Sequence, residues 1–247
     1  MNHSHRFGVM FGWLSLPLWP LRARSHEPEL LDLPDLDPVE LRANLRELAL
    51  LNRLPGGARA SIRAISRLVG AGEVSILDVG TGGGDLPLAF ARHGRRRGPW
   101  RVIASDSRPE ILDLAAAWTG NEPNVTTLLA DGRQLPIGDG EVDVGHASLV
   151  LHHLDPPDVV LVLRELRRVS RRGVVINDLQ RSVVAFTATA VTVAALARSR
   201  YTRHDGILSA RRAYTLTELD TMLAEAGLRG VWRSSTLFPR VVTAALP

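Results

Sequence analysis

The sequence contains no cysteine, and none of its 30 basic residues is lysine. The absence of cysteine excludes disulfide bonds, thiolate metal sites and a cysteine nucleophile, and it agrees with the cytoplasmic location that we expect. Because arginine keeps its proton far above neutral pH, an all-arginine chain has a high isoelectric point, here about 10.7, although the formal net charge is only +4. The isoelectric point therefore does not indicate a nucleic-acid partner, and we expect none.

Aromatic residues are also scarce, at 5% of the 247 positions. Proteins that bind single-stranded nucleic acids stack the bases on aromatic side chains, so this composition offers few such platforms. The longest basic run, Arg-Arg-Arg at residues 95–97, is short and lies between glycines. This pattern favours a solvated loop over a nucleic-acid contact.

No hydrophobic run is long enough to span a bilayer. The longest N-terminal run, Phe7–Leu21, is interrupted by Pro17 and Pro20. Three interpretations of the extension over residues 1–26 stay open: an export signal with a poor cleavage site, a segment that touches a membrane surface or covers the substrate, and a loose extension.

Residues 27–70 are predicted to form a helical cap. Asp37 is a suitable N-cap residue, and Pro38 fits the first helical position. Leucines then recur at helical spacing, and Pro-Gly-Gly at residues 55–57 predicts the end of the helix. A second helix is expected over residues 58–69.

From residue 71 to residue 247, strand-like and helix-like segments alternate, which predicts one α/β domain with a parallel sheet covered by helices on both faces. The expected strands are residues 75–79, 101–106, 125–130, 142–147 and 173–178, and the expected helices are residues 85–93, 109–118, 157–169 and 217–226. Two strand-like runs after Gly227, with no helix between them, predict a terminal antiparallel hairpin.

The first of these strands leads into a glycine-rich turn with Gly80, Gly82 and Gly84. Glycines here let a ligand contact the backbone at the carboxyl edge of the sheet, where ligands of parallel sheets bind. A dinucleotide-binding turn would have glycine at position 85, but Asp85 stands there, and its carboxylate would repel a pyrophosphate. No Gly-Lys-Ser/Thr sequence follows, which excludes a P-loop.

Acidic residues close the first three expected strands. Asp78, beside backbone amides, suits a ligand that carries both an ammonium and a carboxylate. Asp106 follows at the end of the next strand, where a carboxylate accepts hydrogen bonds from ribose hydroxyls. Asp131 and Gly132 close the third strand, where an acid can receive an adenine amine. An amino acid, a ribose and an adenine in this order describe S-adenosylmethionine.

Four segments, "ILDVGTGGGD", "VIASDSRPEIL", "LLADGRQLPIGDGEVDV" and "HASLVLHHL", resemble the successive motifs of class I S-adenosylmethionine-dependent methyltransferases. The resemblance implies a Rossmann-like, seven-stranded, mostly parallel sheet with its last strand antiparallel. It also implies cofactor contacts at Asp78, Gly80, Thr81, Gly82, Gly84, Asp106, Ser107, Asp131 and Gly132. Sequences outside these motifs resemble, less specifically, a small-molecule subgroup from bacterial secondary metabolism.

His152 and His153 follow the fourth strand, at the active edge of the sheet. An imidazole can accept a hydroxyl proton near neutral pH, so the pair is a candidate general base, although packing beside the cofactor is an equal alternative. The arrangement resembles that of small-molecule O-methyltransferases, which often pair such a histidine with an acid after the fifth strand. The resemblance implies that Asp178 orients the histidine or shares its role as base; the alternative is that Asp178 caps the next segment. The fourth strand ends in His-Ala-Ser at residues 146–148 without an acid, so no metal is expected.

The segment Val183–Ala197 is apolar almost all round, which predicts either a buried core helix or one wall of an apolar substrate pocket. The polar stretch that follows contains Arg203, His204 and Asp205. These three residues are candidate substrate contacts, with a solvated loop that ends in a helix N-cap as the alternative.

These observations favour O-methylation of a hydrophobic small molecule, such as a phenolic or polyketide-like compound, with S-adenosylmethionine as the cofactor. C-methylation of a quinone-like ring, and methylation of RNA or protein, are the alternatives. We expect a monomer or homodimer whose only membrane contact would be peripheral and through the N-terminus.

Overall fold

The computed structural model describes residues 21–54, 57–95, 98–120, 122–235 and 240–246. The predictions for the apolar run Phe7–Leu21 and for the arginine run at residues 95–97 therefore lie almost wholly outside the described residues. Within the described part of the chain, no helix is long and apolar enough to cross a membrane.

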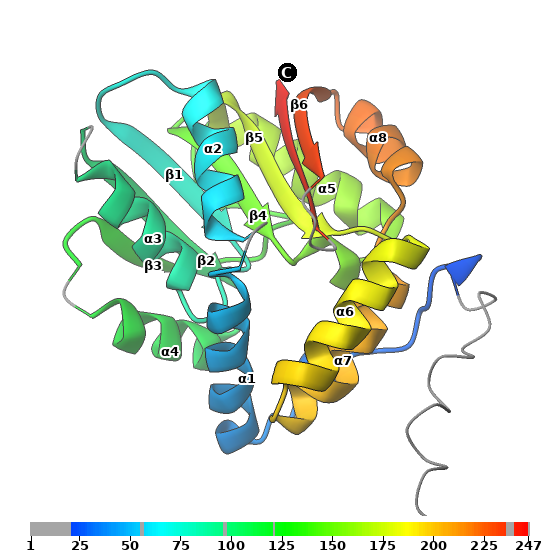
Figure 1. The fold of residues 1–247 in the computed structure, drawn as a ribbon. Coiled ribbons are helices and arrows are strands. Elements are labelled where there is room, and N and C mark those ends of the chain that lie inside the picture. Colours follow the sequence, from blue (N-terminus) through cyan, green and yellow to red (C-terminus); the bar gives the residue numbers. More distant parts are fainter. Residues whose placement is uncertain (1–20, 55–56, 96–97, 121, 236–239, 247) are drawn as a thin grey trace, which may run out of the picture.

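A seven-stranded sheet forms the centre of the molecule, in the order β3-β2-β1-β4-β5-β7-β6 (Figure 1). Its strands are β1 (Val74–Val79), β2 (Trp100–Asp106), β3 (Val125–Leu129), β4 (Val142–Ser148), β5 (Ser170–Leu179), β6 (Arg229–Ser235) and β7 (Arg240–Leu246). The first five strands are parallel, and β7 runs antiparallel between β5 and β6. The predicted fold class and terminal hairpin are confirmed.

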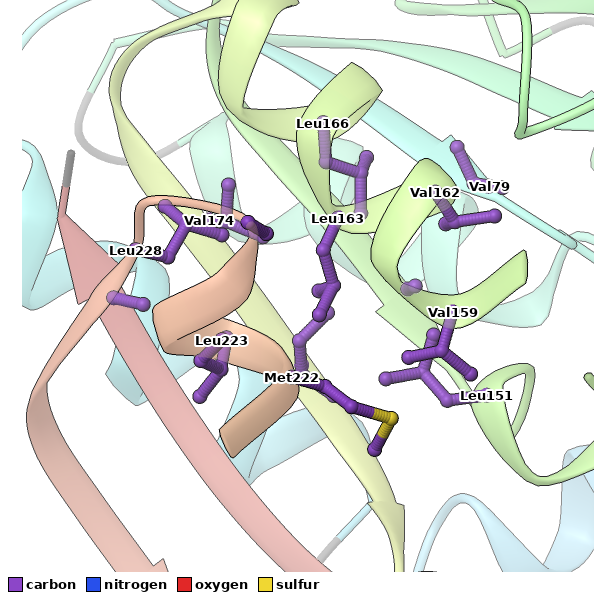
Figure 2. Close-up of a cluster of buried hydrophobic side chains, with 14 of the residues drawn as sticks. Val79, Leu151, Val159, Val162, Leu163, Leu166, Val174, Met222, Leu223 and Leu228 are labelled. Carbon is purple, nitrogen blue, oxygen red and sulfur yellow. The ribbon is translucent and has the colours of Figure 1, made fainter. Parts of the chain in front are cut away.

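Helices cover both faces of the sheet, as the alternating pattern predicted (Figure 1). One face carries α2 (Ala58–Leu68), α3 (Asp85–Gly94) and α4 (Pro109–Thr119), and the other carries α5 (Pro156–Val169) and α8 (Leu216–Glu225). Figure 2 shows the second face, where Leu163 and Leu166 of α5 and Leu223 of α8 belong to one cluster of buried hydrophobic side chains. These side chains are almost completely buried, and each contributes about 1.5–3 kcal/mol through removal of apolar surface from water.

Three further helices lie beyond the carboxyl ends of the strands: α1 (Pro38–Leu51), α6 (Val183–Leu196) and α7 (Arg200–Arg212) (Figure 1). Asp37 caps α1 as predicted, since its carboxylate accepts hydrogen bonds from the backbone of Val39 and Glu40. Of the two helices expected in the cap, only α1 lies there, because α2 packs on β5 and β7. The cap is completed instead by α6 and α7.

The interpretation of residues 200–212 as a loop is wrong, because these residues form α7. The Ser199 hydroxyl caps the helix by accepting a hydrogen bond from the Tyr201 backbone. Gly206 lowers helix propensity, but it also lets α7 approach α6: a β-carbon there would lie 2.6 Å from a methyl group of Val193. The close packing of α7 against α6 therefore outweighs the low helix propensity of Gly206.

The interpretation of α6 as a buried core helix is also wrong. Val184 and Val191 are 77% and 63% exposed, whereas Ala185 and Val193 on the opposite face are buried. Thr189 and Val193 line the main cavity of the described structure. The alternative interpretation, a helix that forms one wall of a pocket, therefore describes α6.

Candidate active site

A cavity of about 640 Å³ lies at the carboxyl edge of the sheet, between the strand ends and the helices α1, α6 and α7. Its volume is in the range of small-molecule and cofactor sites. The strands supply acids at its floor, among them Asp78 at the end of β1 and Asp106 at the end of β2. The helices supply apolar walls, among them Leu45 and Leu48 of α1.

The glycine-rich turn after β1 opens directly onto this cavity. Gly80 and Gly82 have φ angles of 66° and 55°, in the left-handed region that favours glycine. At Gly80 a β-carbon would also lie 2.4 Å from a Val150 methyl group. Gly80, Thr81 and Gly82 all line the cavity, so the predicted turn presents its backbone to a ligand.

Asp106 and Ser107 line the same cavity, as expected for residues that contact a ribose. One oxygen of Asp106 accepts a hydrogen bond from the Gly82 backbone, and the other accepts one from the Arg108 backbone. Burial raises the pKa of Asp106 despite these bonds. The strand end therefore presents a carboxyl group that is largely withdrawn from water.

Asp78 is held by a buried network that the sequence did not reveal. Its carboxylate accepts a hydrogen bond from Thr81 at 2.8 Å and lies 2.6 Å from Nδ1 of His146. The other ring nitrogen of His146 lies 2.9 Å from the Ser61 hydroxyl, which also accepts a hydrogen bond from Asn177. This network, from α2 through β4 to β1, fixes the orientation of Asp78.

Three other residues predicted to bind the cofactor, Gly84, Asp131 and Gly132, are not among the residues that line the cavity. Asp131 is bonded to Arg133 through both oxygens, and neither Asp131 nor Gly132 is among the lining residues. A β-carbon at Gly132 would lie 2.7 Å from Val79, and one at Gly84 would lie 2.8 Å from Thr119. Gly132 and Gly84 therefore permit close packing, and the structure shows no ligand-facing position for them.

Asp85 belongs to a second polar group at the cavity. Asn52, at the end of α1, donates a hydrogen bond to Asp85 at 3.0 Å and accepts one from Arg240 at 2.6 Å. Burial raises the pKa of Asp85 and lowers that of Arg240 to about 10. Asn52 thus links α1 to α3 and β7 at the wall of the cavity.

The two candidate catalytic histidines have different environments. Nδ1 of His152 lies 2.6 Å from a carboxylate oxygen of Asp178, and both side chains are almost completely buried. Although burial opposes ionisation of Asp178, the charge of His152, the hydrogen bond from it and two backbone N–H groups hold the pKa of Asp178 below its ordinary value. An ionised Asp178 keeps a proton on Nδ1 of His152, so Nε2 is the nitrogen that can accept a proton.

His153 instead forms an ion pair with the segment before α1. Its Nδ1 lies 2.7 Å from Asp32 and 3.8 Å from Glu29. Burial opposes the charge, but Glu29 and Asp32 outweigh it and raise the pKa of His153 to about 9. His153 is therefore an imidazolium near neutral pH, and of the two histidines only His152 is suited to be a base.

The segment with Glu29 and Asp32 closes one side of the cavity, and sequence reasoning missed it. Asp205 of α7 accepts hydrogen bonds from the backbone of Leu30 and Leu31. Arg212, at the end of α7, donates to Asp32 and to the His153 carbonyl. The only sequence signal for this segment is its run of acidic residues, whose role the sequence alone did not indicate.

The predicted substrate contacts Arg203 and His204 are not among the lining residues of the cavity. Arg203 donates to the Ala197 carbonyl, and the His204 ring pairs with Asp205. The third candidate, Asp205, does line the cavity together with Thr202, because α7 turns this face toward it.

Within the described residues, Glu29, His152 and His153 offer ligand atoms that lie within 4.8 Å of one another. Such a group could hold a metal ion if both rings were neutral. The raised pKa of His153 opposes this, because an imidazolium has no ring nitrogen free for a metal. That the reaction uses no metal stays a prediction.

Comparison with known proteins agrees with this geometry. A family model described as a methyltransferase domain matches residues 76–173. An uncharacterised methyltransferase of Synechocystis sp. is 30% identical over 98 residues, which cover 40% of this chain and 42% of that protein. An uncharacterised 37.1 kDa protein in a transposon of Streptomyces fradiae is 37% identical over 99 residues, which cover 40% of this chain and 28% of that protein. The chain thus matches less than half of the length of these relatives.

Several solved structures share the fold. A SAM-dependent methyltransferase from Aquifex aeolicus has a TM-score of 0.60 at 20% identity, covering 85% of this chain and 98% of that one. Human N-acetylserotonin methyltransferase in complex with SAM has a TM-score of 0.63 at 15% identity, covering 84% and 55%. An O-methyltransferase family 2 protein from Planctomyces limnophilus, in complex with apigenin, has a TM-score of 0.59 at 21% identity, covering 87% and 63%. Residues 76–173 therefore match a methyltransferase domain, and the chain has the fold of the class I S-adenosylmethionine-dependent methyltransferases.

Proposed function

We propose that this protein transfers a methyl group from S-adenosylmethionine to a hydroxyl group of a hydrophobic small molecule. The observation that carries the proposal is the pairing of His152 with Asp178 at a cavity that also contains the glycine-rich turn and Asp106. A base and a cofactor site therefore share one enclosed space. The human and Planctomyces structures with bound SAM and apigenin support this class of ligands for the fold.

The residues at the floor of the cavity fit this cofactor. Thr81 and His146 hold Asp78, whose carboxylate would bind the ammonium group, and Asp106 would accept hydrogen bonds from the ribose hydroxyls. Gly80 and Gly82 keep the backbone open to the ligand. When bound, the cofactor supplies an electrophilic methyl group on a sulfonium and leaves as a neutral thioether.

His152 performs the proton transfer in this mechanism. Its Nε2 accepts the hydroxyl proton while the hydroxyl oxygen forms its bond to the methyl group, and the Asp178 carboxylate stabilises the resulting imidazolium. The remaining contribution of the protein is to align the two reactants, which can supply a large part of the rate enhancement in a displacement reaction. The walls formed by α1 and α6 exclude water from the hydroxyl.

The cavity is less suited to a nucleic acid. Acidic side chains outnumber arginines among its lining residues, seven to four, which disfavours a polyanion. The scarcity of aromatic residues, on which bases could stack, also favours a small-molecule substrate over a nucleic acid. The absence of cysteine supports a location in the reducing cytoplasm. A phenolic compound of secondary metabolism, such as a polyketide, fits the apolar walls.

The test is a partition assay with methyl-labelled S-adenosylmethionine and an extract of the cells that make the protein. We expect label in the organic-soluble fraction, lost in the Asp106→Asn variant and retained in Asp220→Asn, a matched change on exposed α8 surface. Label in RNA or protein would contradict the proposal. If the labelled product carried its new methyl group on carbon, methyl transfer would be supported, but the proposed O-methylation would be replaced by C-methylation.

A further inference from the structure

A buried carboxylate oxygen faces the cavity without a hydrogen-bond partner. Glu29 is 2% exposed, and its Oε2 accepts a hydrogen bond from the Ser209 hydroxyl at 2.9 Å. Its Oε1 is buried and accepts none from the described residues, and Nε of Arg212 lies 3.7 Å away. Because an unpaired buried acceptor is costly, this oxygen indicates a donor that arrives with a ligand.

The proton acceptor of the proposed reaction lies opposite this oxygen. Nε2 of His152 is 3.9 Å from Oε1 of Glu29, which is too far for a hydrogen bond between them. With its proton held on Nδ1 by Asp178, His152 presents a lone pair at Nε2. Two acceptors therefore face the same small space, and a ligand that satisfies both must bring two hydrogens.

We propose that the substrate is a dihydroxylated aromatic ring whose two hydroxyl groups are ortho or meta to each other, and that Glu29 selects it by accepting the hydrogen bond of the hydroxyl that is not methylated. The first hydroxyl gives its proton to Nε2 of His152 and receives the methyl group. The second keeps its proton and bonds to Oε1 of Glu29. This inference rests on the proposed O-methylation and adds the class of substrate.

The relative position of the hydroxyls follows from the distance between the acceptors. Groups ortho or meta on a ring point to the same side and can reach two atoms 3.9 Å apart, whereas para groups point in opposite directions. The carboxylate also disfavours a ring that carries its own carboxylate at this position. Leu45, Leu48 and Val193 line the same cavity and provide space for an apolar substituent on the ring.

The most direct test is the structure of the natural product of the reaction. The labelled compound from the organic fraction is purified, and the position of its new methoxyl group is determined by NMR. We expect a free hydroxyl ortho or meta to that methoxyl group. An aromatic product with no second hydroxyl, or with one only in the para position, would overturn the inference and leave O-methylation intact.

A second test uses matched synthetic substrates: 5-pentylresorcinol and 4-pentylcatechol, each beside its monomethyl ether. The ether keeps one reactive hydroxyl but lacks the second donor, so we expect its kcat/KM to be about 10- to 100-fold lower. In Glu29→Gln, whose amide can donate to the ether oxygen, this ratio falls to about 1. Glu225→Gln, the same chemical change on the exposed surface of α8, keeps a ratio close to that of the wild type.

The outcomes separate the two proposals. Equal kcat/KM for diol and ether in the wild-type enzyme would refute the role of Glu29, while the O-methylation itself would stand. If Glu29→Gln lowered kcat/KM equally for diol and ether, so that their ratio stayed unchanged, Glu29 would have a structural role or would support His152. This result would also refute the selection of the second hydroxyl by Glu29. S-adenosylhomocysteine affinity and thermal unfolding of each variant identify a misfolded protein, and in that case the wild-type ratio decides. If no hydroxyl compound is methylated by any assay, the proposed function itself fails.

Discussion

Because of His153, we expect the folded protein to become less stable as the pH becomes alkaline. The pKa of His153 is raised from 6.5 to about 9 by Glu29 and Asp32 against the opposing effect of burial. A raised pKa stabilises the folded state fully below the unfolded value of 6.5, and this contribution is lost as the pH rises through about 9. The increase in the pKa of His153 from 6.5 to about 9 corresponds to about 3 kcal/mol of unfolding free energy. Because the ring is 22% exposed, solvent screens its ion pairs, and this value is an upper bound.

The assay is urea unfolding of the wild type and His153→Gln between pH 6 and 10. We expect the wild type to lose up to about 3 kcal/mol of unfolding free energy relative to the variant between pH 6.5 and 9.5. Proteolysis of the segment with Glu29 and Asp32 should increase over the same interval. Asp32→Asn, which removes the carboxylate 2.7 Å from the ring, should shrink the effect. Parallel curves for wild type and His153→Gln, or an NMR titration of His153 with a midpoint near 6.5, would refute the reasoning.

Three substitutions test other parts of the site. Asp178→Asn should lower kcat about 10²- to 10⁴-fold, because an amide no longer fixes the proton on Nδ1 of His152. Calorimetry should show an unchanged affinity for S-adenosylhomocysteine, and a weakened affinity would instead assign Asp178 to the cofactor site. Gly80→Ala, with its positive φ and its close approach to Val150, should abolish that binding, and a normal affinity would contradict the assigned turn geometry. Ser61→Ala removes a partner of the buried His146 ring, and we expect a loss of about 1–3 kcal/mol in urea unfolding together with weaker cofactor binding; an unchanged protein would show that the network does not orient the floor of the cavity.

Much of the sheet and the floor of the cavity could be predicted from the sequence, because their signals are local. Each acid of the floor closes an apolar strand, as Asp78 and Asp106 do, and the glycine-rich turn occupies consecutive positions. Parallel strands bring their carboxyl ends to one edge, so spacing along the chain determines proximity in space. The pairing of His152 with Asp178 was instead implied by the resemblance to small-molecule O-methyltransferases, and the two side chains lie 2.6 Å apart.

The other side of the cavity could not be predicted in this way. His153 and Asp32 are 121 residues apart in the chain, and no periodic pattern connects them. Asp131 shows a different difficulty, because the strand does end there, but a local turn directs its carboxylate to the backbone and side chain of Arg133. Strand position predicts where a residue lies, whereas the conformation of the following turn determines where its side chain points.

The substrate side of the cavity is built from two parts of the chain that contribute no strand: the segment from Glu29 through α1, and the helices α6 and α7 between β5 and β6. The sheet, and the glycine-rich turn that we propose to bind the cofactor, lie outside both. Substitutions within these two parts can therefore alter which compound is accepted while the reaction and the fold persist. Duplicated copies of such a gene could diverge in specificity by local change alone, and exchange of these two parts between related enzymes is a rational route to new products.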